Sequence, residues 1–197
     1  MRNSSRGVVD PFIVMDVMEA ARAAEAAGRH IIHMEVGQPG TAAPLGARQA
    51  AAKAMEEDAL GYTVALGLPA LRKRIAQLYG EWYNVDLNPE RVIVTSGSSS
   101  AFLLAFTALF EAGDRVAIGA PGYPSYRQIL KALSLEPVLI EARPENRLQP
   151  VARDLENLNA QGLMVASPAN PTGTMLSKSA MSDLIGAAHE SGTAFVS

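Results

Sequence analysis

The feature that most constrains this chain is a series of short apolar runs in its second half. Successive runs begin 22 to 31 residues apart, which leaves room for a helix between them, whereas antiparallel hairpins need only short turns. The runs are apolar on both faces, as in parallel strands covered by helices. We therefore predict an α/β fold with a doubly wound, mostly parallel sheet. The runs begin near Val92, Val116, Val138, Leu163 and Ala194.

The sequence ahead of the first run favours helices. Each expected helix has apolar or alanine positions at helical spacing, and the third begins with a proline, which suits a first helical turn. These helices are expected over residues 15–28, 47–58 and 69–83.

A turn separates the first two helices, because residues 36–40 contain two glycines and a proline. We place a domain boundary close to this turn. Residues 1–45 are expected to form a helical N-terminal arm with a small-domain segment. Residues 46–197 are expected to form the first part of the larger sheet domain.

Composition excludes several classes of function. The net charge is -3, from 17 basic and 20 acidic residues, so neither nucleic acid nor an anionic membrane is an expected partner. The absence of cysteine excludes disulfides, thiolate metal sites and a cysteine nucleophile, and fits a reducing compartment. Asp10, Pro11 and Asp16 interrupt the apolar N-terminal stretch, so we expect no signal peptide and a cytoplasmic location.

A serine-rich turn follows the run at Val92. Gly97, Ser98 and Ser99 lie between this run and an apolar helical stretch that begins at Ala101. A helix N-terminus with hydroxyl side chains offers the N–H groups and the positive dipole end that a phosphate needs. Serines that merely cap a helix give the same pattern, so this turn alone does not decide between the two interpretations.

The same turn permits a second interpretation as a serine hydrolase. Small residues flank Ser99 between a strand and a helix, as in a nucleophile elbow. Asp154 or Asp183, followed by His189, gives the order of such a triad. However, no glycine-rich oxyanion segment precedes the turn, and His189 lies in an expected helix over residues 179–190. This alternative therefore ranks second.

Two further loops follow predicted strands. Residues 120–126 contain two prolines and a glycine around Tyr123, whose ring could stack on a flat ligand or simply pack against its own loop. Residues 167–173 contain two prolines around Asn170, which could donate an oriented hydrogen bond or belong to a plain turn. In parallel sheets such loops share the ligand-binding edge.

These motifs together resemble the class I/II aminotransferases of fold type I, the aspartate aminotransferase-like enzymes that use pyridoxal 5'-phosphate. Order and spacing carry the resemblance, which covers nearly the whole chain. The matching segments are residues 61–63, Gly67, Leu71, Arg72 and Ile75, residues 95–100, residues 121–124 and residues 170–173.

The resemblance implies a set of cofactor contacts. Gly97, Ser98 and Ser99 would hold the cofactor phosphate. Tyr123 would stack on the pyridine ring, and Asn170 would hydrogen-bond its phenolic oxygen. We expect no bound metal.

The resemblance also implies substrates and a partner subunit. The reaction would transfer an amino group between an amino acid and a 2-oxo acid. Gly37 would lie beside the substrate carboxylate. Tyr62 would reach the cofactor phosphate of the neighbouring subunit in a homodimer.

The lysine that bonds to the cofactor aldehyde, and the aspartate that pairs with the pyridine nitrogen, would lie beyond Ser197. Lys178 comes too early to be that lysine, and we interpret it as a first-turn helical residue capped by Ser177. The chain is thus expected to be an inactive N-terminal half that ends within a strand. A third interpretation is a non-catalytic phosphate-binding remnant.

Folding of the isolated chain is a separate expectation. In the resembled fold, the strand over residues 92–95 pairs with a strand that these 197 residues do not supply. We therefore expect this run to lose its ladder partner and the isolated chain to fold poorly.

Overall fold

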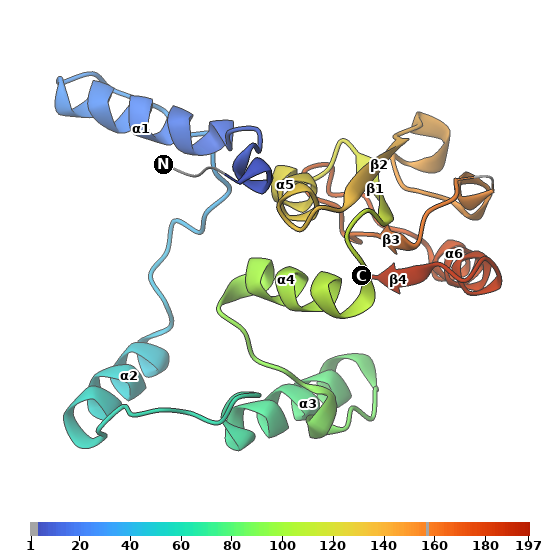
Figure 1. The fold of residues 1–197 in the computed structure, drawn as a ribbon. Coiled ribbons are helices and arrows are strands. Elements are labelled where there is room, and N and C mark those ends of the chain that lie inside the picture. The colour runs from blue at the N-terminus through green and yellow to red at the C-terminus, as the bar shows by residue number, and fades with distance from the viewer. Residues whose placement is uncertain (1–3, 157) are drawn as a thin grey trace. The chain divides into compact units, whose positions relative to one another are not determined.

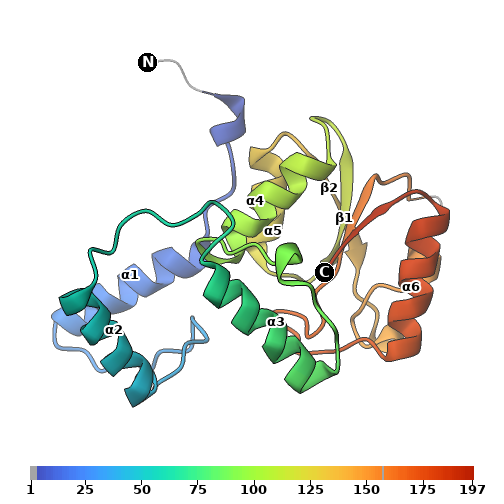
Figure 2. The same cartoon turned by 90° about the horizontal axis from the view of Figure 1, so that it is seen from below.

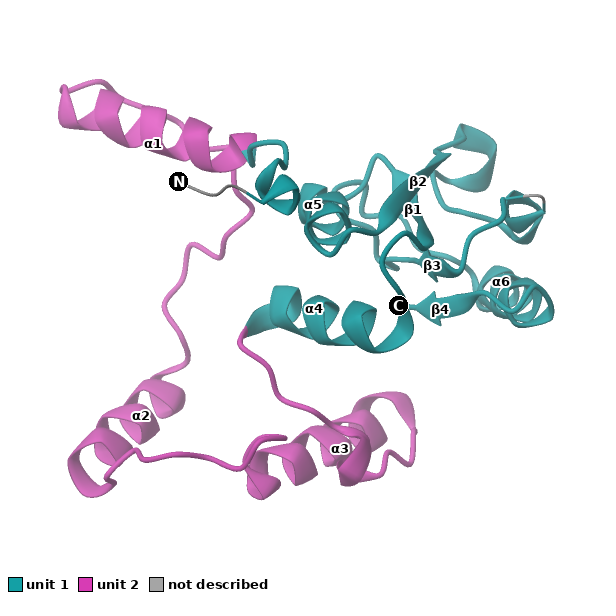
Figure 3. Cartoon of the chain, in the orientation of Figure 1, with its two compact units in different colours: residues 1–12, 97–197 teal, residues 13–96 magenta. Residues whose placement is uncertain are grey.

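The computed structural model describes residues 4–156 and 158–197. It divides into two units, which we treat separately (Figure 3): unit 1 is Met1–Phe12 with Gly97–Ser197, and unit 2 is Ile13–Ser96. This division concerns packing, and the boundary expected near residue 45 stays a prediction. Among the described residues, no helix is long and apolar enough to cross a membrane.

Unit 1 contains a four-stranded sheet with the order β2-β1-β3-β4 (Figure 1). Every strand pair is parallel, which confirms the sheet type predicted from the apolar runs. The strands are β1 (Arg115–Ala120), β2 (Glu136–Glu141), β3 (Gly162–Met164) and β4 (Ala194–Val196).

Helices cover both faces of this sheet (Figure 2), as a doubly wound fold requires. The α-helices are α4 (Gly97–Leu109), α5 (Pro124–Ala132) and α6 (Lys178–Glu190), and the short 3-10 helices are η1 (Ser5–Gly7), η3 (Pro144–Asn146) and η4 (Ala152–Leu155).

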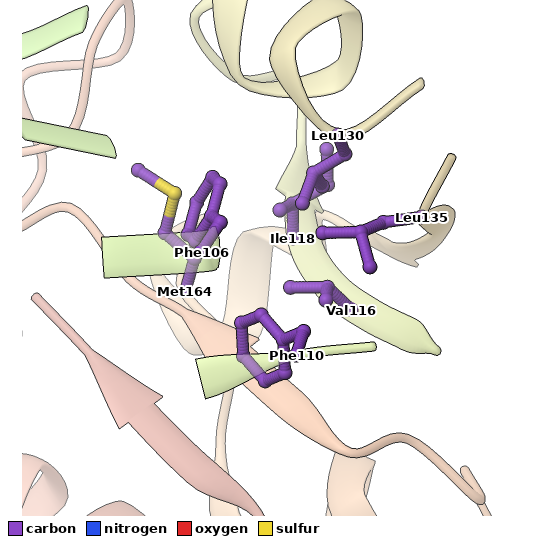
Figure 4. Close-up of a cluster of buried hydrophobic side chains, with 7 residues drawn as sticks. All are labelled: Phe106, Phe110, Val116, Ile118, Leu130, Leu135 and Met164. Atoms are coloured by element: carbon purple, nitrogen blue, oxygen red, sulfur yellow. The ribbon is translucent and has the colours of Figure 1, made fainter. Parts of the chain in front are cut away.

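One apolar cluster joins α4 and α5 to the first face of the sheet (Figure 4). Burial of these side chains is the main favourable term in folding this unit. The cluster consists of Phe106, Phe110, Val116, Ile118, Leu130, Leu135 and Met164.

A second cluster joins α6 and η4 to the opposite face. Neighbouring residues of β1 and β3 alternate between the two clusters, as the pleat of a strand dictates. Both faces of these central strands are therefore covered by apolar side chains and shielded from solvent. The second cluster consists of Ala117, Ile140, Leu155, Leu163, Val165, Leu184 and Ala188.

Unit 2 consists of three α-helices and a short 3-10 helix. Neither α1 nor α2 buries a residue, whereas α3 buries Arg72 and Ala76. All three predicted helices are confirmed to within two residues at each end. The elements are α1 (Ile13–Ala26), α2 (Leu45–Glu57), α3 (Pro69–Tyr83) and η2 (Pro89–Arg91).

The strand predicted from Val92 is wrong, because residues 92–95 belong to no strand. Their backbone bonds elsewhere: Val94 N donates to Leu66 O at 3.0 Å, and Val92 O accepts from Arg72 Nε at 2.8 Å. A strand needs a neighbouring ladder, and within unit 2 this run finds single partners instead.

Candidate functional site

The order of the strands creates a crevice at one edge of the sheet. From β1 the chain moves to β2 on one side and then returns to β3 on the other. The helix after β1 is α5, which covers one face, and the helix after β3 is α6, which covers the other. The loops after β1 and β3 therefore diverge at their carboxyl ends, where ligands bind in open α/β sheets.

A cavity of about 30 Å³ lies between these two loops. Its size suits a water-sized group rather than a whole ring, so a ring would have to lie outside it. Both predicted loops line it: Pro121 and Gly122 come from the first, and Ala169 and Asn170 come from the second.

The loop that carries Asn170 is held by its own hydrogen bonds. Ala169 N donates to Thr174 O at 2.9 Å, and Gly173 N donates to Ala169 O at 2.7 Å. Leu176 N donates to Ser167 Oγ at 3.0 Å. The prolines of residues 167–173 therefore stand in a loop with hydrogen bonds of its own.

The ring of Tyr123 lies at the start of α5. It makes edge-to-face contacts with Phe12 at 5.8 Å and with Tyr126 at 5.4 Å between centroids. Burial raises the pKa of the Tyr126 phenol, and Tyr123 adds to this shift. The predicted loop over residues 120–126 is shorter than expected, because Pro124 already begins the helix and pre-sets its first turn.

The direction of α4 places its N-terminus at the same edge. Phe110, just after this helix, lies against Gly162 at the amino end of β3. Phe102, near its start, contacts Tyr126 in the next helix at 5.2 Å between ring centroids. Therefore α4 runs antiparallel to the strands and points its first turn at their carboxyl ends.

The serine turn forms this first turn. Gly97 has a φ of +79°, a backbone conformation that glycine adopts without steric cost. Ser98 and Ser99 are exposed. Three separately encoded segments thus meet one sheet edge: the start of α4, the loop before α5 and the loop before α6.

Tyr62 and Gly37 belong to unit 2, whereas the sheet edge belongs to unit 1. The Tyr62 side chain is fully exposed. Their roles stay predictions.

Comparisons with known proteins now add to this geometry. A profile of the family described as aminotransferase class I and II matches residues 29–197. The chain belongs to this family. Its members depend on pyridoxal phosphate, the cofactor that the sequence motifs imply.

Individual aminotransferases support the same assignment. The chain is 47% identical to valine–pyruvate aminotransferase of Mycobacterium tuberculosis, over 89% of the chain and 46% of that protein. It is similar to a crystal structure of an aminotransferase from the same organism, with a TM-score of 0.95 and 43% identity, over 99% of the chain and 51% of the other.

The chain is also similar to a protein from Silicibacter pomeroyi whose crystal structure is known. The two share 67% sequence identity and superpose with a TM-score of 0.89, over 99% of this chain and 50% of that protein. The chain thus spans about half the length of the aminotransferases that it matches.

The fold disfavours the hydrolase alternative. Ser99 lies on α4, whereas Asp183 and His189 lie on α6, and these helices cover opposite faces of the sheet (Figure 2). Asp154 is already engaged by the Arg143 guanidinium and accepts from Val151 N at 2.9 Å. These residues do not assemble a triad.

Sequence reasoning missed Gln149. This residue is 4% exposed and lines the same cavity as Asn170. A single polar residue between Leu148 and Pro150 carries no sequence pattern that marks it, so only the fold reveals its position beside the aminotransferase motifs.

Proposed function

We propose that this chain forms the cofactor-binding half of an aminotransferase that moves an amino group between an amino acid and a 2-oxo acid. The observation that carries the proposal is the meeting of three separately encoded segments at one sheet edge. Family membership supports the reaction class, and the edge supports the place of the cofactor.

The groups at this edge suit pyridoxal phosphate in their chemistry. The first turn of α4 supplies backbone N–H groups, hydroxyl side chains and the positive end of a 13-residue helix, all of which favour a phosphate dianion. We assign Gly97, Ser98 and Ser99 to the phosphate. When bound, pyridoxal phosphate supplies the electron sink that amino-acid chemistry requires.

The other two loops act on the ring. We assign the aromatic face of Tyr123 to stacking, which holds the pyridine plane and excludes water from one side. We assign Asn170 to the phenolic oxygen, toward which its amide donates one hydrogen bond. Orientation of the ring, rather than proton transfer, is the contribution of these two side chains.

The proton-transferring lysine of the family has no counterpart that we would assign within these 197 residues. Lys131 pairs with Asp10 at 3.1 Å, and its hydrogen bond lowers the pKa of that carboxyl. Lys178 is exposed in the first turn of α6, where Ser177 caps the helix. We therefore propose that residues 1–197 alone bind the cofactor reversibly and do not turn over.

The finer features of the intact enzyme are also proposals. We propose a homodimer in which Tyr62 reaches the phosphate of the neighbouring subunit, with Gly37 beside the substrate carboxylate. The relative named for valine and pyruvate supports that pair as the first substrates to test. The lack of cysteine supports a cytoplasmic location.

Direct titration tests this proposal. The purified chain is titrated with pyridoxal phosphate, with inorganic phosphate as competitor, and compared with the double variant Ser98→Ala, Ser99→Ala. We expect the variant to bind roughly tenfold or more weakly, because hydrogen bonds to a charged group are the stronger kind. Ser177→Ala, at the N-terminus of another helix, is the matched control and should bind normally.

The same samples separate the alternatives. Borohydride reduction followed by mass spectrometry should give no specific lysine adduct, and an active-serine probe should leave Ser99 unlabelled. Selective labelling of Ser99 would support the hydrolase. An affinity for pyridoxal phosphate that is the same in the double serine variant as in the unchanged chain would overturn the proposed phosphate site.

A further inference from the structure

The buried amide of Gln149 contacts both ends of the loop that carries Asn170. Its Nε2 donates to Thr174 O at 2.8 Å and lies 3.2 Å from Ala166 O. These two carbonyls stand on either side of Asn170 in the chain. One side chain from another segment thus joins the two arms of this loop.

The contact to Thr174 is central to the loop. Thr174 O also accepts from Ala169 N at 2.9 Å, so one carbonyl receives a donor from within the loop and a second from Gln149. Thr174 Oγ1 lies 3.3 Å from the same Nε2. Without the amide, the half-buried carbonyls of Ala166 and Thr174 lose the donor that joins them.

The position of Gln149 is itself fixed to β1. The next residue, Pro150, packs at the carboxyl end of this strand, where a Cβ added to Gly119 would lie 3.7 Å from Pro150 Cγ. The loop with Tyr123 leaves the same strand. Gln149 therefore links the loop of Asn170 to the end of β1, from which the loop with Tyr123 departs.

We propose that Gln149 is a positioning residue, which sets the place of Asn170 relative to the phenolic oxygen of pyridoxal phosphate. This inference rests on the proposed function. It assigns Gln149 no contact with the cofactor, so its effect should pass entirely through Asn170.

A double-mutant cycle on the 197-residue chain tests this coupling. Gln149→Met keeps the length and burial of the side chain but removes its donor, and Asn170→Ala removes the proposed cofactor contact. We expect each single change to weaken pyridoxal phosphate binding roughly three- to tenfold, the worth of one hydrogen bond. The double variant should bind no more weakly than Asn170→Ala alone.

A cofactor analogue sharpens this test. With 3-deoxypyridoxal phosphate, which lacks the phenolic oxygen, Gln149→Met should bind as well as the unchanged chain. Additive losses in the cycle, or an equal loss with the analogue, would assign Gln149 a purely structural role and overturn the inference.

Hydrogen exchange tests the loop without any cofactor. Gln149→Met should speed exchange at the amides of Ala169 and Gly173, and Gln149→Asn, which retains a shorter amide, should have a smaller effect. Gln161→Met is the matched control, since Gln161 Oε1 accepts from Arg115 N at 2.9 Å at the other edge of the sheet. It should change neither exchange in the loop nor cofactor binding.

The outcomes separate the two proposals. Unchanged loop exchange in Gln149→Met, or unchanged affinity where Asn170→Ala weakens it, overturns the positioning role alone. Failure to bind by an unchanged chain whose β1 amides resist hydrogen exchange, and which is therefore folded, overturns the proposed cofactor site and the positioning role with it. Failure of Asn170→Ala to weaken binding does the same.

Discussion

The two units of this chain are held together by different means. Unit 1 buries two apolar clusters on either side of a parallel sheet. In unit 2, Ala76 is the one buried apolar residue among those described, and large apolar side chains such as Trp82 are exposed. Unit 1 is thus organised by side chains distant in sequence, whereas unit 2 is organised mainly by local helix preference.

This difference carries a physical lesson about helices. Isolated helices of 13 to 15 residues, the lengths found in unit 2, are marginal in water and gain most of their stability from packing an apolar face. Helices of similar length in unit 1 have that packing. We therefore expect the amides of β1 to resist hydrogen exchange far longer than those of α2.

The largest expected effect comes from removing a buried ring of unit 1. Phe106 is fully buried in the first cluster, and Phe106→Ala should destabilise unit 1 by about 3–5 kcal/mol through lost burial and the cavity left behind. The loss is measured as the change in the free energy of unfolding by urea, with hydrogen exchange of the β1 amides as the probe.

The control lies on the same helix. Leu104 is 59% exposed, so Leu104→Ala should have a much smaller effect. Equal losses from the two variants would mean that the cluster does not hold unit 1 together.

A smaller effect is expected from the one buried cation of unit 2. The Arg72 guanidinium donates to Val92 O at 2.8 Å and to Glu90 at 3.2 Å, which joins α3 to the segment that follows it. Arg72→Met should destabilise this contact by about 1–3 kcal/mol, because a buried carbonyl loses its donor. Trp82, the single tryptophan and a residue of α3, reports it by fluorescence during urea unfolding.

Arg74→Met is the comparison variant, since Arg74 forms an exposed ion pair with Glu81, a kind of contact that contributes little. If Arg72→Met lowered the free energy of unfolding no more than Arg74→Met does, the buried contact of Arg72 would not stabilise unit 2. The difference in packing between the two units would then be larger than described.

Capping of α6 should contribute less. Ser177 Oγ accepts from Ala180 N at 3.1 Å, and Ser177→Ala should cost about 1 kcal/mol. Hydrogen exchange in the first turns of α6 measures it. Ser182→Ala, an exposed position of the same helix, should be nearly neutral, and a larger loss there would contradict the capping assignment.

The smallest effect concerns pH in unit 2. Hydrogen bonds that the His33 ring donates to Glu35 and, with a smaller effect, to Glu25 raise the pKa of His33 to about 9. The pKa of His33 is higher in the folded chain than the ordinary value of 6.5, so the contact stabilises the folded state fully at pH values below 6.5. This stabilisation is lost as the pH rises through about 9. NMR titration of the ring measures the midpoint.

In Glu35→Gln the His33 midpoint should fall toward 6.5, because the larger contribution is removed. Since His33 and Glu25 are solvent-exposed, the effect on global stability should be small. A midpoint already near 6.5 in the unchanged chain would show that the contact does not persist in solution.

The sequence was sufficient for elements whose cause is local or periodic. Spacing of apolar runs predicted five parallel strands, of which four form, and Pro69 predicted the start of α3. The strand at Val92 does not form, because a ladder needs a distant partner. The local pattern does not report that partner, and the family resemblance implies that these 197 residues do not supply it. The interpretation of residues 120–126 as one loop failed at Pro124, since proline serves both a loop and a first helical turn.

The candidate site shows the same division. Tyr123 and Asn170 follow apolar runs that form strands, so their place at the carboxyl edge could be predicted. The serine turn follows a run that forms no strand, and the packing of α4 locates it instead. Gln149 could not, because its importance comes from two carbonyls that approach it only after folding. Whether Tyr62 and Gly37 join this edge depends on the arrangement of the two units, which a motif does not encode.

The parallel pair β1 and β3 lies inside the sheet, with β2 and β4 outside it. Any strand that widened this sheet would have to attach at its margins, beside β2 or β4. Such growth would leave the pairing of β1 with β3 unchanged. The backbone frame of the ligand crevice therefore does not depend on what attaches to the outer strands.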